Sequence, residues 1–192
     1  PNRIPTRDET LDVDVCVYGN AAAAVMAAIQ AIRLGRSTVV LAPAAELGGM
    51  TTGGLGWTDV GRSEAIGGIA AEFYRLIGRR YGEDMRFCFE PGVAKAVLQE
   101  MIDEACVEVR EMAFLESARV EGRRIRSVTC QGGLQVRATT FIDASYEGDL
   151  MAAAGVPFTV GRESNAVYGE TLNGQQIAAK HQFERPVDPY RR

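Results

Sequence analysis

The sequence predicts an α/β fold in which a parallel sheet is followed by an antiparallel three-stranded β-meander. Residues 11–52 read as a buried strand, a small-residue turn, a helix, a second buried strand and a glycine pair, which is the order of a βαβ unit. Residues 114–142 read instead as three strand-like runs joined by short glycine-containing turns, the pattern of a meander. We therefore expect a central parallel sheet with helices on both sides and the meander as a crossover.

The first βαβ unit is defined by its residue pattern and its end signals. Residues 13–17 alternate valine with other residues in a β-rich run, as in a central parallel strand. Residues 21–34 are rich in alanine, carry apolar residues at helical spacing and end at Gly35, a favoured residue just after a helix. Residues 38–41 form the next strand, which Pro43 ends.

The later elements are predicted from periodicity. Glycine recurs throughout residues 46–68, which indicates a backbone that passes close to a flat or charged group. Apolar spacing predicts helices over residues 70–81 and from Pro91 onward. A third parallel strand is expected at 107–110 and a short helix at 150–154, after which the pattern weakens.

The composition excludes several classes of function. With 46% apolar and 24% charged residues among 192, the chain can bury a core and fits one compact domain. The formal charge of −4 offers no basic surface to nucleic acid or an anionic membrane, and no apolar run reaches the roughly eighteen residues of a membrane span. We expect a cytoplasmic protein. Because the sequence begins at Pro1 without a methionine or a leader-like segment, an exported form whose leader was removed stays open.

The cysteines and the histidine are not expected to form a metal site. The 4 cysteines lack the short spacing of a ligand set, and the 1 histidine, His181, cannot build a histidine cluster. Buried free thiols are the better interpretation of the cysteines. They are Cys16, Cys88, Cys106 and Cys130.

The turn between the first strand and the first helix is the main candidate binding site. Such a turn directs backbone N–H groups and the positive end of the helix dipole at the ligand above it, and the natural ligand is a pyrophosphate. In the dinucleotide pattern G-x-G-x-x-G, the three positions are held here by Gly19, Ala21 and Ala24. Alanine is tolerated at the third position, whereas Ala21 adds a methyl group where the phosphate approaches. Asn20 and Ala23 complete the predicted turn contacts.

The end of the second strand departs further from the dinucleotide pattern. An acidic residue about twenty positions after the first glycine normally binds the ribose hydroxyls, but this place is taken by Ala42, followed by Pro43. Losing a hydrogen bond to a charged group, worth ~1.5–3 kcal/mol, weakens binding about tenfold to a hundredfold unless another acceptor takes over. Glu46 is near enough in sequence to be that acceptor.

Longer motifs resemble one known family. They are LGGMTTGGLGWTD (47–59), IGGIAAEFY (66–74), FEPGVAKAVLQEM (89–101), FIDASYEGDLMAAAGVPFTVGRES (141–164), GETLNGQQ (169–176) and VDPY (187–190). Together they resemble the FAD-dependent oxidoreductase family of the glutathione-reductase-like superfamily. The resemblance implies a Rossmann-like FAD-binding domain over 12–160, an extension at 1–11 and the start of a truncated substrate domain at 161–192. Members of that family are longer, which implies that this chain is an N-terminal fragment.

The resemblance also implies cofactor contacts. One segment passes along the flavin and comprises Gly48, Gly49, Met50, Thr51 and Thr52. Ala144, Ser145 and Asp149 are placed beside the cofactor's phosphate and ribose, although serine and aspartate are also favoured where a strand ends and a helix begins. Val109 is placed at the adenine edge, and a role in the core of its strand explains it equally well.

The catalytic residues stay unassigned. Trp57, Asp59 and Arg162 lie in loops expected to face the isoalloxazine, where Arg162 could steady a developing negative charge. Solvated loop positions explain all three equally well. A covalent flavin link through His181 is not favoured, because a lone histidine in a polar tail is usually exposed.

The function that follows is flavin-dependent redox chemistry, in which FAD takes a hydride or electrons from a small organic substrate and passes them to oxygen or another acceptor. A catalytically inactive nucleotide-binding or structural fragment that keeps the fold is the main alternative, suggested by Ala21 and Ala42. A nicotinamide-dependent dehydrogenase is a weaker one, because the glycine-rich segment after the second strand suits a flavin better. No nucleic-acid or membrane partner is expected, a homo-oligomer stays open, and the sequence does not identify the substrate.

Overall fold

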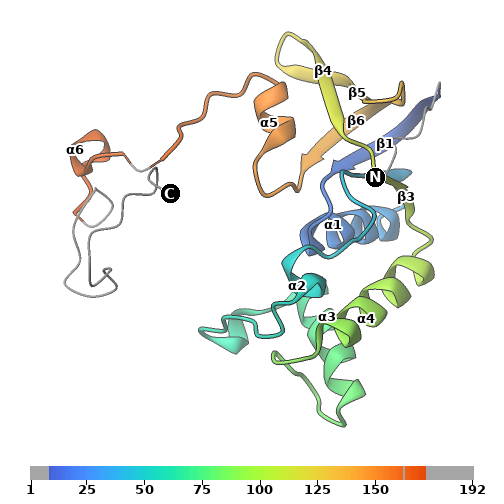
Figure 1. The fold of residues 1–192 in the computed structure, drawn as a ribbon, viewed down its shortest axis with the longest axis vertical. Helices are drawn as coiled ribbons and strands as arrows, with labels where there is room; N and C mark the ends of the chain where they lie inside the picture. The colour runs from blue at the N-terminus through green and yellow to red at the C-terminus, as the bar shows by residue number, and fades with distance from the viewer. Residues whose placement is uncertain (1–8, 162, 172–192) are drawn as a thin grey trace, which may run out of the picture. The chain divides into compact units, whose positions relative to one another are not determined.

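The fold is built on one six-stranded mixed sheet (Figure 1). The computed structural model describes residues 9–161 and 163–171, and the chain divides into two compact units, residues 1–156 and 157–192. The sheet lies in the first unit, in the order β3-β2-β1-β6-β5-β4. Its strands are β1 (Thr10–Tyr18), β2 (Thr38–Ala42), β3 (Glu108–Glu111), β4 (Leu115–Glu121), β5 (Arg124–Cys130) and β6 (Gln135–Asp143).

The strand pairing confirms the predicted combination of parallel sheet and meander. β1 pairs in parallel with β2 and with β6, and β2 pairs in parallel with β3. β5 pairs antiparallel with both β4 and β6. β6 therefore belongs to both parts, because it closes the meander and also lies beside β1.

The helices that the sequence predicts, α1, α3, α4 and α5, begin and end within a few residues of their predicted bounds. The first unit holds α1 (Ala22–Arg33), α2 (Met50–Gly53), the 3₁₀ turn η1 (Ser63–Ala65), α3 (Gly68–Arg80), α4 (Pro91–Glu104) and α5 (Asp149–Ala153), and the second holds α6 (Asn165–Tyr168). The short helices α2 and α6 and the turn η1 were not predicted. The helix α2 lies in the glycine-rich segment, where helical propensity is low.

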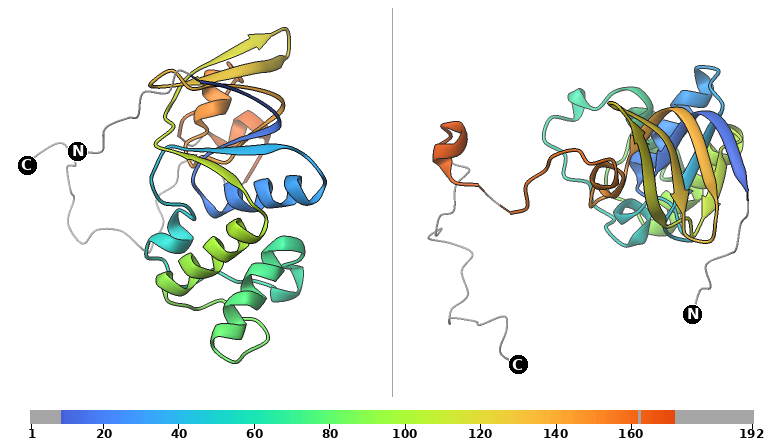
Figure 2. Two further views of the ribbon diagram at one scale, coloured as in Figure 1. Left: turned by 90° about the vertical axis from the view of Figure 1, so that its right-hand side faces the viewer. Right: turned by 90° about the horizontal axis from the view of Figure 1, so that it is seen from above.

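One face of the parallel sheet is covered by helices. Val17 of β1 and Val40 of β2 pack against Ala24 and Ala28 of α1, and all four are fully buried. Small residues on the sheet-facing side of α1 let the helix approach the strands closely. The helices α4 and α3 lie beyond α1 (Figure 2) and form a second apolar cluster with it, which includes Ile29 of α1.

The other face is covered mainly by the sheet itself. Tyr18 and Leu41 of the parallel strands share a buried cluster with Val128 of β5, Val136 of β6 and Leu150 of α5. The strongly twisted sheet curls so that its β4–β5 end lies over its own parallel strands (Figure 2). The expectation of helices on both sides is thus met on this face only by the short helix α5.

Candidate functional site

The candidate site lies where three parallel strands end. β1 lies between β2 and β6, and its last residue, Tyr18, pairs with Leu41 on one side and with Asp143 on the other. Chain connections diverge to the two sides of β1, and open α/β sheets bind ligands at such a point, beyond the carboxyl ends of the strands. The segments that leave the sheet here are residues 19–24, 43–52 and 144–149.

Gly19 brings the first and third of these segments into contact. Its N–H donates to the Leu41 carbonyl at 3.0 Å, and its φ is +134°. A Cβ atom at this position would lie 2.3 Å from the Ala144 carbonyl oxygen and 2.7 Å from the Ser145 nitrogen. Only glycine fits, because both neighbouring atoms belong to backbone.

Gly48 brings the first and second segments together. Its N–H donates to the Asn20 carbonyl at 2.8 Å, and Gly48 pairs with Ala21 in a short parallel bridge. The Asn20 side chain adds a hydrogen bond to the Glu46 carbonyl at 3.3 Å. A Cβ on Gly48 would lie 2.3 Å from the Thr52 side chain. Residues 19–24 and 48–52 therefore lie side by side, the arrangement that a shared ligand requires.

The start of α1 has the properties of an anion-binding helix terminus. Its N-cap residue, Ala21, offers no side-chain hydrogen bond to the first turn, and no acidic residue lies there. Ala23 in that turn is exposed, whereas Ala24 is fully buried against the sheet. Ala21 is only 8% exposed, so the methyl group that departs from the glycine pattern presents little surface to a ligand. The positive end of the α1 dipole is therefore met by neither a capping side chain nor an acidic residue of its own first turn.

The end of β2 offers no carboxylate for a ribose. Ala42 is fully buried, and its carbonyl accepts a hydrogen bond from Ala113 N at 2.9 Å. Glu46, the suggested substitute, pairs instead with Lys95 of α4, its Oε1 lying 2.9 Å from Nζ. Both side chains are more than half exposed, at 68% and 54%, so the pair can open at small cost. Glu46 is available to a ligand only in competition with Lys95.

The polar residues after β6 form a local network. The Asp143 carboxylate accepts hydrogen bonds from Ser145 N at 3.0 Å, from Ser145 Oγ at 2.7 Å and from Met151 N at 2.8 Å. Ser145 Oγ in turn accepts from the N–H groups of Gly148 and Asp149, each at 3.0 Å. These side chains hold the start of α5, so a ligand would meet mainly the backbone of this turn.

Asp149 itself is exposed and extends the acidic character of this turn. Partial burial, followed by the nearby carboxylates of Glu147 and Asp143, raises the pKa of Asp149 above its ordinary value.

Tyr146 belongs to the site although the sequence patterns did not single it out. Its hydroxyl accepts a hydrogen bond from Met50 N at 2.9 Å and so joins the second segment to the third. The available signal was an aromatic residue directly after a strand end, in a turn otherwise made of small and acidic residues.

Val109 and Pro43, which were also predicted to contact the cofactor, lie within β3 and directly after β2. Val109 of β3 is half-buried, pairs with Val40 and packs in the cluster beneath α1, which supports its core role. Pro43 follows β2 and is half-buried.

Two of the three catalytic candidates, Trp57 and Asp59, lie on the loop that follows α2. Trp57 is 75% exposed, its backbone pairs with Cys88, and both line an open hollow of about 650 Å³. Asp59 is exposed on the same loop. Arg162 and His181 lie outside the residues that the structure describes.

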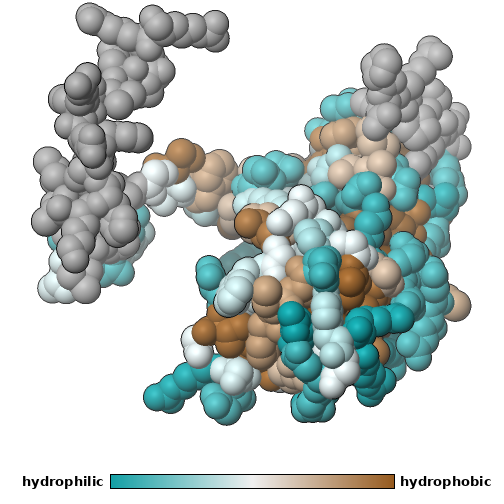
Figure 3. Space-filling view, turned by 60° about the horizontal axis from the view of Figure 1, so that its bottom comes forward, coloured by the Kyte–Doolittle hydropathy of each residue, from teal (hydrophilic) through white to brown (hydrophobic). Residues whose placement is uncertain are grey.

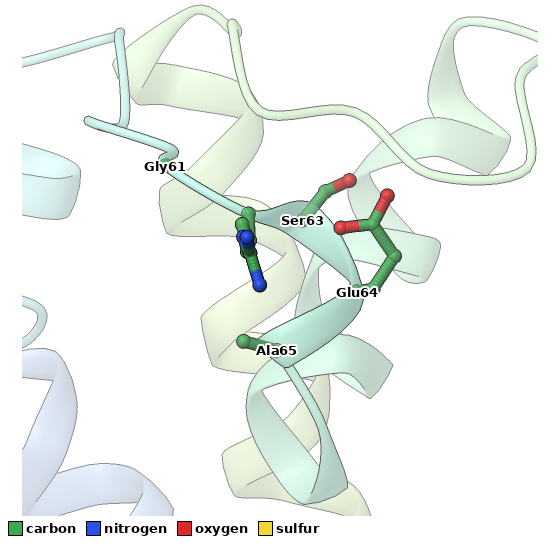
Figure 4. Close-up of a pocket in the computed structure, with 5 residues that line it drawn as sticks. Gly61, Ser63, Glu64 and Ala65 are labelled. Carbon is green, nitrogen blue, oxygen red and sulfur yellow. The ribbon is translucent and has the colours of Figure 1, made fainter.

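A second hollow, of about 720 Å³, is lined by residues 61–65 alone. In Figure 4 the side chains of Ser63 and Glu64 extend to one side of the turn and Ala65 to the other. All five residues are exposed. Because they do not converge on a common point, this hollow carries no site.

The cysteines were predicted to be buried, and two of the four are. Cys16 and Cys130 are buried, Cys88 is half-buried and Cys106 is exposed, and none of the four forms a disulfide. Over residues 9–161 and 163–171, no group of three or more histidine, cysteine or acidic side chains is arranged to hold a metal ion. In the same ranges, no helix combines the length and apolar character needed to cross a bilayer.

Comparison with known proteins decides the family. The profile of the family described as FAD dependent oxidoreductase matches residues 14–191. The chain belongs to this family. No curated protein matches the sequence.

Several solved structures share the fold at low sequence identity. L-proline dehydrogenase from P. horikoshii is 12% identical with a TM-score of 0.60, over 81% of this chain and 59% of that one. The 3-ketosteroid-delta4-(5alpha)-dehydrogenase from Rhodococcus jostii RHA1 is 15% identical with a TM-score of 0.52, over 69% and 45%. The L-amino acid deaminase from Proteus vulgaris is 12% identical with a TM-score of 0.53, over 75% and 50%. These likenesses show the fold, and the chain spans about half the length of these structures.

Proposed function

We propose that this chain forms the FAD-binding part of an oxidoreductase that oxidises a small organic substrate and passes the electrons to oxygen or another acceptor. The observation that carries the proposal is the side-by-side placement of residues 19–24 and 48–52 at the start of α1. Membership of an FAD-dependent family supports the choice of ligand.

The residues present fit the diphosphate of a dinucleotide. The first turn of α1 supplies N–H groups and the positive end of the dipole, with no acidic side chain to compete. Gly19 and Gly48 hold the neighbouring segments close enough to surround the ligand. When bound, FAD would supply the redox chemistry, while these residues bind and orient it.

The adenosine end is the weak part of the site. Ala42 replaces the usual acidic residue, and the Glu46 carboxylate is paired with Lys95. This observation favours the second candidate function, a domain that keeps the fold without retaining FAD. The two candidates differ in a direct measurement, because purified protein of the first kind is yellow and releases FAD on unfolding, and FAD raises its unfolding temperature.

Replacing Ala23 by aspartate tests the site itself. Ala23→Asp places a negative charge in the exposed first turn of α1, which stabilises an isolated helix start by about 0.3–1 kcal/mol but repels a diphosphate. We expect unchanged or higher thermal stability together with at least a roughly tenfold loss of FAD affinity by fluorescence titration. Ala23→Ser is the matched control, since it adds a similar small polar group without charge and should retain binding. Equal FAD affinity for Ala23→Asp and the native chain would show that the diphosphate is bound elsewhere or not at all.

A further inference from the structure

Tyr146 links two segments of the candidate site that are far apart in the sequence. Its hydroxyl accepts the N–H of Met50 at 2.9 Å across 96 residues. The side chain is 54% exposed, so burial of the ring does not explain its place. Met50 is 55% exposed as well. Apolar and hydrophilic patches alternate over the face of the molecule that Figure 3 shows.

Gly49 gives independent evidence that this contact is built into the site. Its φ is +54°, and a Cβ there would lie 2.2 Å from the Tyr146 hydroxyl oxygen. Any other residue at position 49 would therefore displace the hydroxyl from the Met50 N–H. The backbone of the glycine-rich segment and the phenol fit each other closely.

The turn that carries Tyr146 is held rigidly on its N-terminal side. Ser145 donates both its N–H and its hydroxyl to Asp143 Oδ1, and its Oγ accepts two backbone N–H groups from the start of α5. The contact of Gly19 with Ala144 adds a second constraint. The phenol thus extends from a fixed support toward the backbone of residues 48–50. The Gly48 N–H of this segment is bonded to the Asn20 carbonyl at 2.8 Å, whereas the Met50 N–H is bonded to Tyr146.

We propose that Tyr146 is a positioning residue for the dinucleotide, which holds residues 48–50 in their binding conformation before the ligand arrives. The inference rests on the proposed function. Glycine-rich backbone loses much conformational freedom when it is ordered, and a segment that is already ordered does not lose that freedom on binding. Removing the hydroxyl therefore weakens the ligand that uses this segment.

The first measurement is amide hydrogen exchange in the ligand-free protein. Tyr146→Phe keeps the ring and removes the acceptor, and the Met50 amide is expected to exchange roughly threefold to tenfold faster, as for the loss of one neutral hydrogen bond. Tyr81→Phe is the matched control, because the Tyr81 hydroxyl accepts the N–H of Glu90 at 3.1 Å in the same way outside the site. Unchanged exchange at Met50 in Tyr146→Phe would overturn the proposal.

The second measurement separates positioning from general stability by comparing FAD with ADP, which shares the diphosphate but lacks the flavin half. Residues 48–52 are expected to pass along the flavin, whereas the diphosphate is expected to meet the start of α1. In calorimetric titration, Tyr146→Phe is therefore expected to weaken FAD roughly threefold to tenfold and to leave ADP within about twofold, while Tyr81→Phe changes neither. Equal weakening of both ligands would show a merely structural role, and tighter FAD binding would show that the phenol blocks the site; either result overturns the proposal.

Ligand binding by the native chain distinguishes failure of the proposed function from failure of the positioning role alone. A native chain that binds neither FAD nor ADP refutes the proposed function, and the positioning role with it. A native chain that binds FAD with an affinity that Tyr146→Phe leaves unchanged refutes the positioning role alone.

Discussion

Replacing Gly19 by alanine is the most direct test of how the ends of β1 and β6 meet. The added Cβ would lie 2.3 Å from the carbonyl oxygen and 2.4 Å from the carbonyl carbon of Ala144. These atoms cannot move aside easily, because Ala144 N donates to the Tyr18 carbonyl at 2.7 Å and Ser145 is tied to Asp143. The φ of +134° adds a backbone strain that an L-residue must bear.

The two costs can be estimated separately. Overpacking of a rigid site costs about 1–3 kcal/mol, and a strained backbone conformation costs about 1–3 kcal/mol more. The sum, roughly 2–6 kcal/mol, is a large part of the ~5–15 kcal/mol that stabilises a typical domain. For a chain of this size, about 2–4 °C per kcal/mol gives a fall in Tm of roughly 4–24 °C.

Thermal unfolding followed by circular dichroism measures this fall. Gly35→Ala is the matched control, because Gly35 also has a positive φ, +75°, but no atom lies within 4 Å of its added Cβ. The control is expected to lose only the strain contribution, about 1 kcal/mol. The reasoning would be refuted if Gly19→Ala unfolded within about 1 °C of the native chain, or if both variants lost the same stability.

Two further predictions concern charge and thiol chemistry. Arg33 of α1 and Glu72 of α3 form two hydrogen bonds of 2.7 Å, but both side chains are 38% exposed, so the pair should stabilise the fold by less than about 1 kcal/mol. These hydrogen bonds lower the pKa of Glu72 below its ordinary 4.5, so the stabilisation is complete above that value and is lost as the pH falls through the lowered pKa. Glu72→Gln should therefore unfold at a slightly lower temperature than the native chain near pH 7, with a difference that vanishes in acid; a constant difference would contradict the assignment. Burial raises the pKa of Cys16 to about 12, and the thiolate is the reactive form, so a thiol reagent at about pH 8 should label exposed Cys106 promptly and Cys16 only after unfolding, as peptide mass mapping can show.

Local patterns predicted most of the secondary structure. The alanine-rich run that became α1 and the proline that opens α4 are signals within one element, and their bounds were nearly correct. The helix α2 was missed because a glycine-rich segment does not favour helix; its turn is held by bonds to the surrounding backbone, such as Thr52 Oγ1 to the Leu47 carbonyl at 2.7 Å. The covering of the second face of the sheet was also missed, because the curl of β4 and β5 depends on packing across the whole sheet.

The sequence named some residues of the candidate site and missed others, because only some of the contacts there join residues that are neighbours in the chain. The residue pattern named Gly19, since a strand followed by a glycine turn has a recognisable local form, and the family resemblance named the segment at 48–52. The resemblance also named the polar residues after β6. The sequence did not decide between ligand contact and a local helix start, and their observed hydrogen bonds are local. Tyr146 was not found.

The amino-acid sequence alone determined the order and type of the elements, the α/β class and the need for glycine in the turn after β1. These properties depend on residues that are neighbours in the chain, whose spacing and backbone preferences act locally. Only the tertiary structure decided that Asn20 meets the Glu46 segment, 26 residues away, and that Tyr146 meets Met50, 96 residues away. Such contacts depend on how a twisted sheet brings strand ends together, and a pattern of neighbouring residues does not specify which distant partners meet there.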